Sequence, residues 1–90
     1  MRILVVEDEY KIANAIKRGL EQESYAVDVC YDADDGLSSA LADEYDVIIL
    51  DRMLPGSMDG VGVCQSIRDT GNHTPILFLT AKDQVRDRVV

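Results

Sequence analysis

The ninety-residue sequence lacks tryptophan and has one phenylalanine, two prolines and two cysteines. No apolar run approaches the roughly 20 residues of a membrane-spanning helix. The chain turns acidic directly after Val6, unlike a secretory signal peptide. Without such a signal, Cys30 and Cys64 are expected to be reduced packing thiols and not a disulfide. These absences predict a single small cytoplasmic globular domain that does not engage a membrane.

Positive charge is also scarce. The sequence has nine lysines and arginines against seventeen aspartates and glutamates, which gives a net charge of -8. Such a surface repels phosphates, so direct binding of this chain to nucleic acid is not expected. The acid serves solubility if it is spread over the surface and holds a cation if it is gathered at one place. Its positions in the sequence decide between the two.

Four short apolar runs indicate β-strands, because runs rich in β-branched residues are typical of buried strands. The second run alternates, with Val27 and Val29 opposite Asp28 and Cys30, and its acidic outer face predicts a strand at the sheet edge. The four predicted strands cover residues 2–6, 25–32, 46–50 and 75–81.

The segments between the strands show helical periodicity. The first helix is predicted over residues 9–23, and the second is expected to be capped by Asp34 or Asp35. The side chains expected on the buried helix faces are Ile12, Ile16 and Leu20 in the first helix, Leu37, Ala40 and Leu41 in the second, Val61, Cys64 and Ile67 in the third, and Val85 and Val89 at the start of a fourth.

This alternation of strands and helices predicts an α/β fold, a doubly wound parallel sheet with helices on both faces. Ligands bind such sheets beyond the carboxyl ends of the strands, where the winding reverses. Asp51 follows the third strand, and Glu7 and Asp8 follow the first. If these strands are neighbours, three carboxylates meet there, which is costly unless they bind a cation or retain protons. A hard ion such as Mg2+ suits such ligands, whereas Glu9 is expected only to cap the first helix.

The stretches "ILVVEDE", "DVIILDRMLPGSMDG" and "PILFLTA" cover nearly the whole chain in order. With them the chain resembles the receiver domain of two-component response regulators, in the branch whose members carry a C-terminal winged-helix DNA-binding domain. The resemblance implies a flavodoxin-like (CheY-like) sheet of strand order 2-1-3-4, which the family completes with a fifth strand and a fifth helix. This order is a general property of flavodoxin-like sheets.

The resemblance also implies the roles of individual residues. Asp51 matches the phosphoacceptor, Asp8 the principal Mg2+ ligand and Glu7 its partner, often acting through water. The backbone carbonyl of Met53 completes the metal site, and Thr80 matches the hydroxyl that contacts the phosphoryl group and acts as a switch. A carboxylate is a competent nucleophile for forming an aspartyl phosphate, and catalysis of phosphoryl transfer is mostly positioning and charge neutralisation.

The sequence departs from the family pattern at three places. Arg52 follows the acceptor where many members have an apolar residue or another side chain, and this departure carries little weight. Ser57 is an extra residue between "LPG" and "MDG". The chain ends at Val90, before the fifth strand and the lysine that the family places on it. We therefore expect residues 1–90 to form a C-terminally truncated receiver domain without an effector domain, which accepts phosphate slowly or incompletely. We also expect the chain to dimerise through the exposed fourth strand and the helix after it.

The predicted function is Mg2+-dependent phosphorylation on Asp51 by a cognate sensor histidine kinase, which switches a DNA-binding output carried elsewhere. Such a domain accepts phosphate without being a turnover enzyme in the usual sense. One alternative is a truncated receiver that serves only interaction or dimerisation. Another is a metal-dependent phosphatase-like hydrolase, which normally has a second acid two residues after the nucleophile, where this sequence has Met53.

Overall fold

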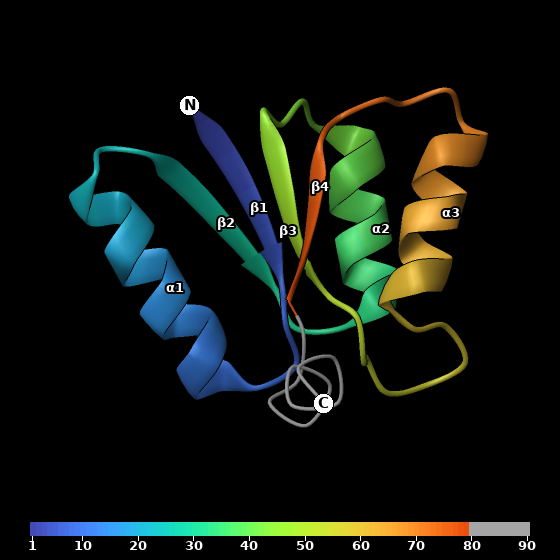
Figure 1. The fold of residues 1–90 in the computed structure, drawn as a ribbon, viewed down its shortest axis with the longest axis horizontal. Helices are drawn as coiled ribbons and strands as arrows, with labels where there is room; N and C mark the ends of the chain where they lie inside the picture. The colour runs from blue at the N-terminus through green and yellow to red at the C-terminus, as the bar shows by residue number, and fades with distance from the viewer. Residues whose placement is uncertain (80–90) are drawn as a thin grey trace, which may run out of the picture.

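The computed structural model describes residues 1–79, in which strands and helices alternate (Figure 1). The predicted strand at residues 2–6 is found at those residues, and the other strands agree to within a few residues. The elements are β1 (Arg2–Val6), α1 (Tyr10–Gln22), β2 (Ala26–Cys30), α2 (Ala33–Ala42), β3 (Val47–Asp51), α3 (Gly60–Asp69) and β4 (Ile76–Leu79).

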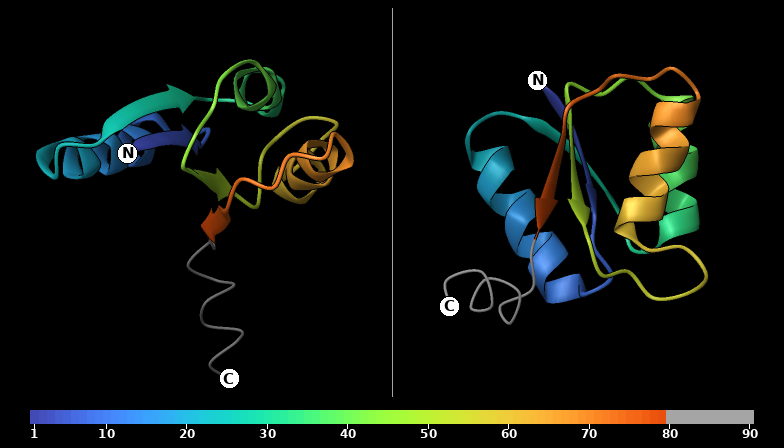
Figure 2. Two further views of the ribbon diagram at one scale, coloured as in Figure 1. Left: turned by 90° about the horizontal axis from the view of Figure 1, so that it is seen from above. Right: turned by 45° about the vertical axis from the view of Figure 1, so that its right-hand side comes forward.

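The described strands form one parallel sheet of order β2-β1-β3-β4, as predicted. α1 covers one face of this sheet, and α2 and α3 cover the other (Figures 1 and 2). The chain winds outward from β1 to β2 and then returns past β1 to β3. The reversal therefore lies between β1 and β3, and their carboxyl ends flank the expected ligand site.

β1 lies inside the sheet and is covered on both faces. Its residues Ile3 to Val6 are all buried, which explains their continuous apolar character. Ile3 and Val5 pack in the cluster on the α1 side, whereas Leu4 and Val6 pack in the cluster on the α2 and α3 side. The strand that precedes the acidic pair is thus held by two cores.

β2 lies at an edge of the sheet, as its acidic face predicted, but Cys30 is not on the exposed side. Cys30 is buried in the core beside α2, with its sulfur 3.3 Å from the hydroxyl oxygen of Ser39. Burial raises the pKa of this thiol above its ordinary value. Both cysteines are free, as expected.

α2 begins earlier in the chain than the sequence suggested. The N-cap is Asp32, whose carboxylate accepts a hydrogen bond of 2.7 Å from the backbone N–H of Asp35, so the prediction of Asp34 or Asp35 as the cap was wrong. The buried face consists of Ala33, Gly36 and Ala40, and Leu41 is exposed. Small residues let this helix lie close to the sheet. Ala40 was predicted on the buried face, whereas Ala33 and Gly36 were not, because they carry little or no apolar side chain.

The buried faces of the other two helices also differ in part from the prediction. α1 buries Ala13 and packs Ile16 and Leu20 against the core, while Ile12 is exposed. The buried face of α3 begins one residue earlier than predicted, at Gly60 and not at Val61. Val61 is exposed. The residues buried by α3 are Gly60, Val63 and Ile67.

β4 is the last strand in the order among residues 1–79. It is shorter than predicted within this range, and its residues Leu77 and Phe78 are exposed. The predicted fourth helix and its Val85 and Val89 lie outside the described residues. Among residues 1–79, no helix has the length and apolar character needed to cross a bilayer.

Candidate functional site

Three carboxylates converge at the carboxyl edge of the sheet. Glu7 and Asp8 follow β1, and Asp51 is the last residue of β3. The two strands are paired, with Val6 beside Leu50, so the residues that follow share one edge. Each of the three side chains places an oxygen within 4.8 Å of the others. The convergence that the sequence predicted is therefore present.

The hydrogen bonds of the backbone hold these residues in place. The backbone N–H of Glu7 donates to the carbonyl of Cys30 at 3.0 Å, which extends the pairing of β1 with β2. The N–H of Arg52 donates to the carbonyl of Leu79 at 3.3 Å, and the N–H of Met53 donates to Asp51 Oδ1 at 3.1 Å. The acids thus project from rigid strand ends, which gives the site a fixed geometry.

Burial distinguishes Glu7 from its two neighbours. Glu7 is only 5% exposed, whereas Asp8 and Asp51 are half-buried. Two like charges about 5 Å apart repel by on the order of 3 kcal/mol at an effective dielectric constant of about 20. Desolvation, followed by the interactions with Asp51 and Asp8, raises the pKa of Glu7 from 4.5 to about 8. This shift favours the protonated form of Glu7 near neutral pH in the metal-free site.

The donor set suits a small divalent cation with oxygen ligands. In an octahedral Mg2+ site with bonds of about 2.1 Å, adjacent oxygens lie about 3.0 Å apart and opposite ones about 4.2 Å, so three oxygens within 4.8 Å of one another would draw together by up to about 2 Å to share one ion. Beside the triad, a hollow of about 430 Å3 is lined by Asp8, Asp59 and the loop residues 52–56. It leaves room for a small charged group next to the acids.

The other predicted site residues have different outcomes. Met53 lies in the loop after β3 and lines this hollow. Thr80 lies outside the described residues, so its role stays a prediction. Glu9 occupies the N-cap position of α1, but within residues 1–79 its side chain makes no capping hydrogen bond, and that expectation was wrong. The sequence pattern also missed Gly60, which touches the backbone of Asp51.

The metal-free protein is expected to lose stability as the pH rises from about 5 to about 8. The folded-state pKa of Glu7, about 8, exceeds its ordinary value of 4.5, so the folded state binds a proton that the unfolded state has released in this window. The free energy of unfolding therefore falls with rising pH and levels off above the folded-state pKa. Urea unfolding at a series of pH values, with a chelator present to keep the protein metal-free, measures this free energy of unfolding.

Glu7→Gln is the variant that isolates this effect, because glutamine is neutral throughout. The part of the decline in unfolding free energy that is due to Glu7 is the difference between the wild-type and Glu7→Gln curves of this free energy against pH. Glu21→Gln, at an exposed position, is the matched control. Parallel curves for wild type and Glu7→Gln would contradict a proton held on Glu7.

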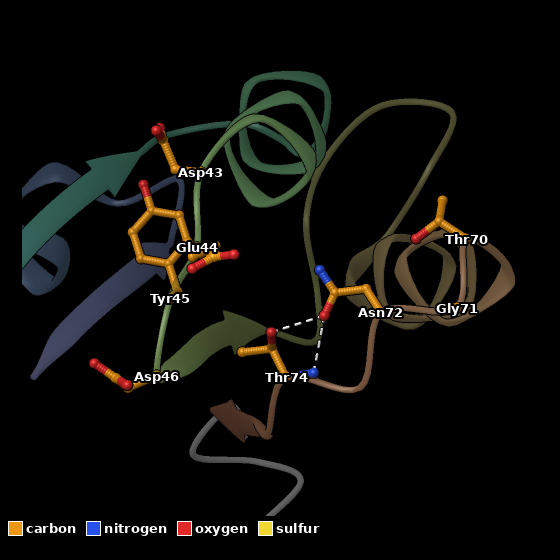
Figure 3. Close-up of a pocket in the computed structure, with 8 residues that line it drawn as sticks. All are labelled: Asp43, Glu44, Tyr45, Asp46, Thr70, Gly71, Asn72 and Thr74. Atoms are coloured by element: carbon orange, nitrogen blue, oxygen red, sulfur yellow. Dashed lines mark hydrogen bonds between the residues drawn. The ribbon is translucent and has the colours of Figure 1, made fainter.

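A larger recess lies at the opposite, amino-terminal end of the strands (Figure 3). Its volume is about 630 Å3, and it is lined by residues 43–46 and by part of the turn after α3. Two of its carboxylates already have cationic or backbone partners: Asp46 accepts from the N–H of Arg2 at 2.6 Å, and Asp43 lies 3.8 Å from the Arg2 guanidinium. Asn72 accepts from Thr74 within the turn. None of the predicted site residues within residues 1–79 lines this recess.

The fold and the acidic edge define a class of protein. A sequence model described as the response regulator receiver domain matches residues 3–90, and the chain belongs to this family. The structure is similar to the receiver domain of the Francisella response regulator 1452, with a TM-score of 0.86, 31% identity and coverage of 98% of this chain and 72% of that one.

Several named proteins are similar to this chain. The transcriptional regulatory protein DltR of Streptococcus agalactiae is 49% identical over 89 residues, and PcoR of Escherichia coli is 48% identical over 88. The chain spans about two-fifths of the length of these curated relatives. The response regulator TrrA of Thermotoga maritima, solved in complex with Mg2+ and BeF, shares 35% identity at a TM-score of 0.85, over 96% of this chain and 74% of that one.

Proposed function

We propose that this receiver domain accepts a phosphoryl group on Asp51 in a Mg2+-dependent reaction. The observation that carries the proposal is the convergence of Glu7, Asp8 and Asp51 within 4.8 Å at the carboxyl edge of the sheet. Of these three residues, Asp51 ends the apolar strand β3 and borders the loop that lines the hollow. Asp8, Asp51 and the Met53 carbonyl would hold the cation, with Glu7 acting through water.

The proposed reaction transfers the phosphoryl group between two nucleophiles. An oxygen of the Asp51 carboxylate attacks phosphorus and forms an acyl phosphate, while the bond from phosphorus to the donor breaks and its electron pair leaves with the donor. The N–H of Met53 holds Asp51 Oδ1 at 3.1 Å, which leaves the other oxygen to attack. Bound Mg2+ would supply neutralisation of the phosphoryl charge.

We infer that this receiver domain is cytoplasmic and that its cognate sensor histidine kinase is the phosphoryl donor, because response regulators receive phosphate from such kinases. The relatives DltR and PcoR are transcriptional regulators, and DNA binding as the output of the whole protein is part of the proposal. It would act through protein outside these ninety residues, since the net charge of -8 opposes contact of this domain with DNA. Thr80 is proposed to contact the phosphoryl group.

Acetyl phosphate with Mg2+, followed by intact mass measurement, tests the proposal. We expect one added phosphoryl group on the wild type, none on Asp51→Ala and none when the metal is removed by a chelator. Glu44→Gln is the matched control, because this exposed acid lies at the other end of the sheet. Labelling of Asp51→Ala would overturn the assignment. Continuous release of phosphate without a labelled protein would instead favour a hydrolase.

Homodimerisation is the remaining part of the proposed partnership. Leu77 and Phe78 of β4 are 59% and 41% exposed. An exposed edge strand with apolar side chains favours pairing with a second copy of the chain. We therefore expect a dimer through β4 and the segment after it, which is seen by sedimentation at micromolar concentration and is weakened by Leu77→Lys. A monomer at every concentration would contradict pairing through β4.

A further inference from the structure

The start of α3 lies directly against the backbone that carries the phosphoacceptor. Gly60 is buried, and its backbone N–H donates to the carbonyl of Arg52 at 3.1 Å. A Cβ at Gly60 would overlap the carbonyl oxygen of Asp51 and lie 2.8 Å from the Cα of Arg52. The glycine therefore permits a contact that no residue with a side chain allows unless the backbone shifts.

Gly60 differs in this respect from two other helical glycines of the described chain. No atom of the described residues lies within 4 Å of a Cβ built at Gly19, and the closest atom to one built at Gly62 belongs to the side chain of Met58, at 2.7 Å. A flexible methionine moves at low cost, whereas the backbone of a strand end does not. Added bulk at Gly60 must therefore displace the strand end or the helix.

We propose that Gly60 is a positioning residue for the metal site, an inference that rests on the proposed Mg2+-dependent phosphorylation. Three hydrogen bonds hold the backbone on either side of Arg52: its N–H to Leu79, its carbonyl to Gly60, and the N–H of Met53 to Asp51 Oδ1. The next backbone oxygen along the chain belongs to Met53, the proposed carbonyl ligand. Because a peptide unit is planar, the Arg52 carbonyl moves together with the Met53 N–H and Cα, so shifting it disturbs the hydrogen bond to Asp51 Oδ1 and displaces the backbone atom that carries the Met53 carbonyl.

The N-cap of α3 provides a second means of changing the same contact. Asp59 Oδ1 accepts a hydrogen bond of 2.9 Å from the N–H of Gly62, which fixes the first turn of the helix and so the N–H of Gly60. Removing the cap loosens this turn without adding bulk. Asparagine caps helices about as well as aspartate, so Asp59→Asn removes the charge and keeps the cap.

Selectivity between cations separates positioning from general destabilisation. Mg2+ demands near-ideal octahedral ligands, whereas Ca2+ tolerates longer and less regular ones. For Gly60→Ala we expect the Mg2+ affinity to fall at least about tenfold, which is a change of about 1.4 kcal/mol, and the Ca2+ affinity to fall much less. Gly62→Ala and Gly19→Ala should keep the wild-type ratio. Equal losses for both cations in Gly60→Ala would overturn the proposal.

The Asp59 pair keeps the proposal testable if Gly60→Ala does not fold. We expect Asp59→Ala to lower the ratio of Mg2+ to Ca2+ affinity and Asp59→Asn to retain it. The same ratio in Asp59→Ala as in the wild type would overturn the inference.

Amide hydrogen exchange in the metal-free protein gives a readout that needs no cation. The amides of residues 53 and 60 should exchange faster in Gly60→Ala and at the wild-type rate in Gly62→Ala. Unchanged exchange at both amides in Gly60→Ala would count against the contact. Failure of the wild type to bind Mg2+ would overturn the proposed function itself, whereas wild-type binding with an unchanged ratio in Gly60→Ala would overturn only the role of Gly60.

Discussion

Replacing Asp8 or Asp51 by asparagine is expected to weaken Mg2+ binding about 100-fold, a change of about 2.7 kcal/mol in binding free energy. Each substitution removes a negative ligand oxygen while keeping the size of the side chain. In Asp51→Asn the amide oxygen still accepts from the N–H of Met53, so the loop keeps the hydrogen bond seen in the wild type. The loss of Mg2+ affinity then measures the removal of the ligand charge and not a change in the loop conformation.

Isothermal titration with Mg2+ measures this change. Asp34→Asn is the matched control, because it removes the same charge from an exposed position in the first turn of α2. We expect its affinity to stay close to that of the wild type, since an exposed charge outside the site is screened by salt. Unchanged affinity in both Asp8→Asn and Asp51→Asn would show that the three acids do not form the metal site.

Gly36→Ala is expected to lower the melting temperature by about 10 °C, which for a domain of this size corresponds to about 2 kcal/mol. A Cβ at Gly36 would lie 2.7 Å and 2.8 Å from the two γ-carbons of Val6, which is fully buried. Valine has few alternative χ1 rotamers that would relieve this overlap, so either α2 or β1 must shift. The gain in helix propensity, about 1 kcal/mol, offsets only part of the cost.

Gly19→Ala is the opposite case in the same fold. Gly19 lies in α1 with open space around the added carbon in the described part of the chain, so only the gain in propensity remains. We expect its melting temperature to rise by several degrees, by about 0.5–1 kcal/mol of added stability. Thermal unfolding of the two variants side by side checks both signs. A Gly36→Ala protein as stable as Gly19→Ala would show that Val6 accommodates the carbon freely.

The strands could be predicted from the sequence because a strand buried on both faces needs continuous apolar residues. β1 and β3 lie where "RILVV" and "VIIL" stand, and the alternation of elements led to the parallel sheet. The acids were placed at one edge by the same reasoning, since Glu7 follows β1 and Asp51 ends the neighbouring β3. Local pattern and topology agree at this edge, and the prediction of the triad was confirmed.

The helix faces were harder to predict because their closest contacts are made by residues without side chains. Gly36 and Gly60 carry no apolar signal, yet both lie where a helix closely approaches the sheet. The apolar pattern therefore predicted Val61 as the first buried residue of α3, but Val61 is exposed. The N-cap of α2 was predicted wrongly because three aspartates lie within four positions and the sequence does not distinguish them. Only the backbone conformation shows that Asp32 is the N-cap.

The sequence by itself determined the order of elements, the parallel sheet and the acids at its carboxyl edge, because hydrophobic periodicity and position after a strand are local properties of the chain. Only the tertiary structure decided that Glu7 is buried and has a raised pKa, that Cys30 faces the core, and that Gly60 lies against the backbone of Asp51. These properties arise from neighbours that are distant in the sequence, and burial and close approach exist only once those neighbours pack together.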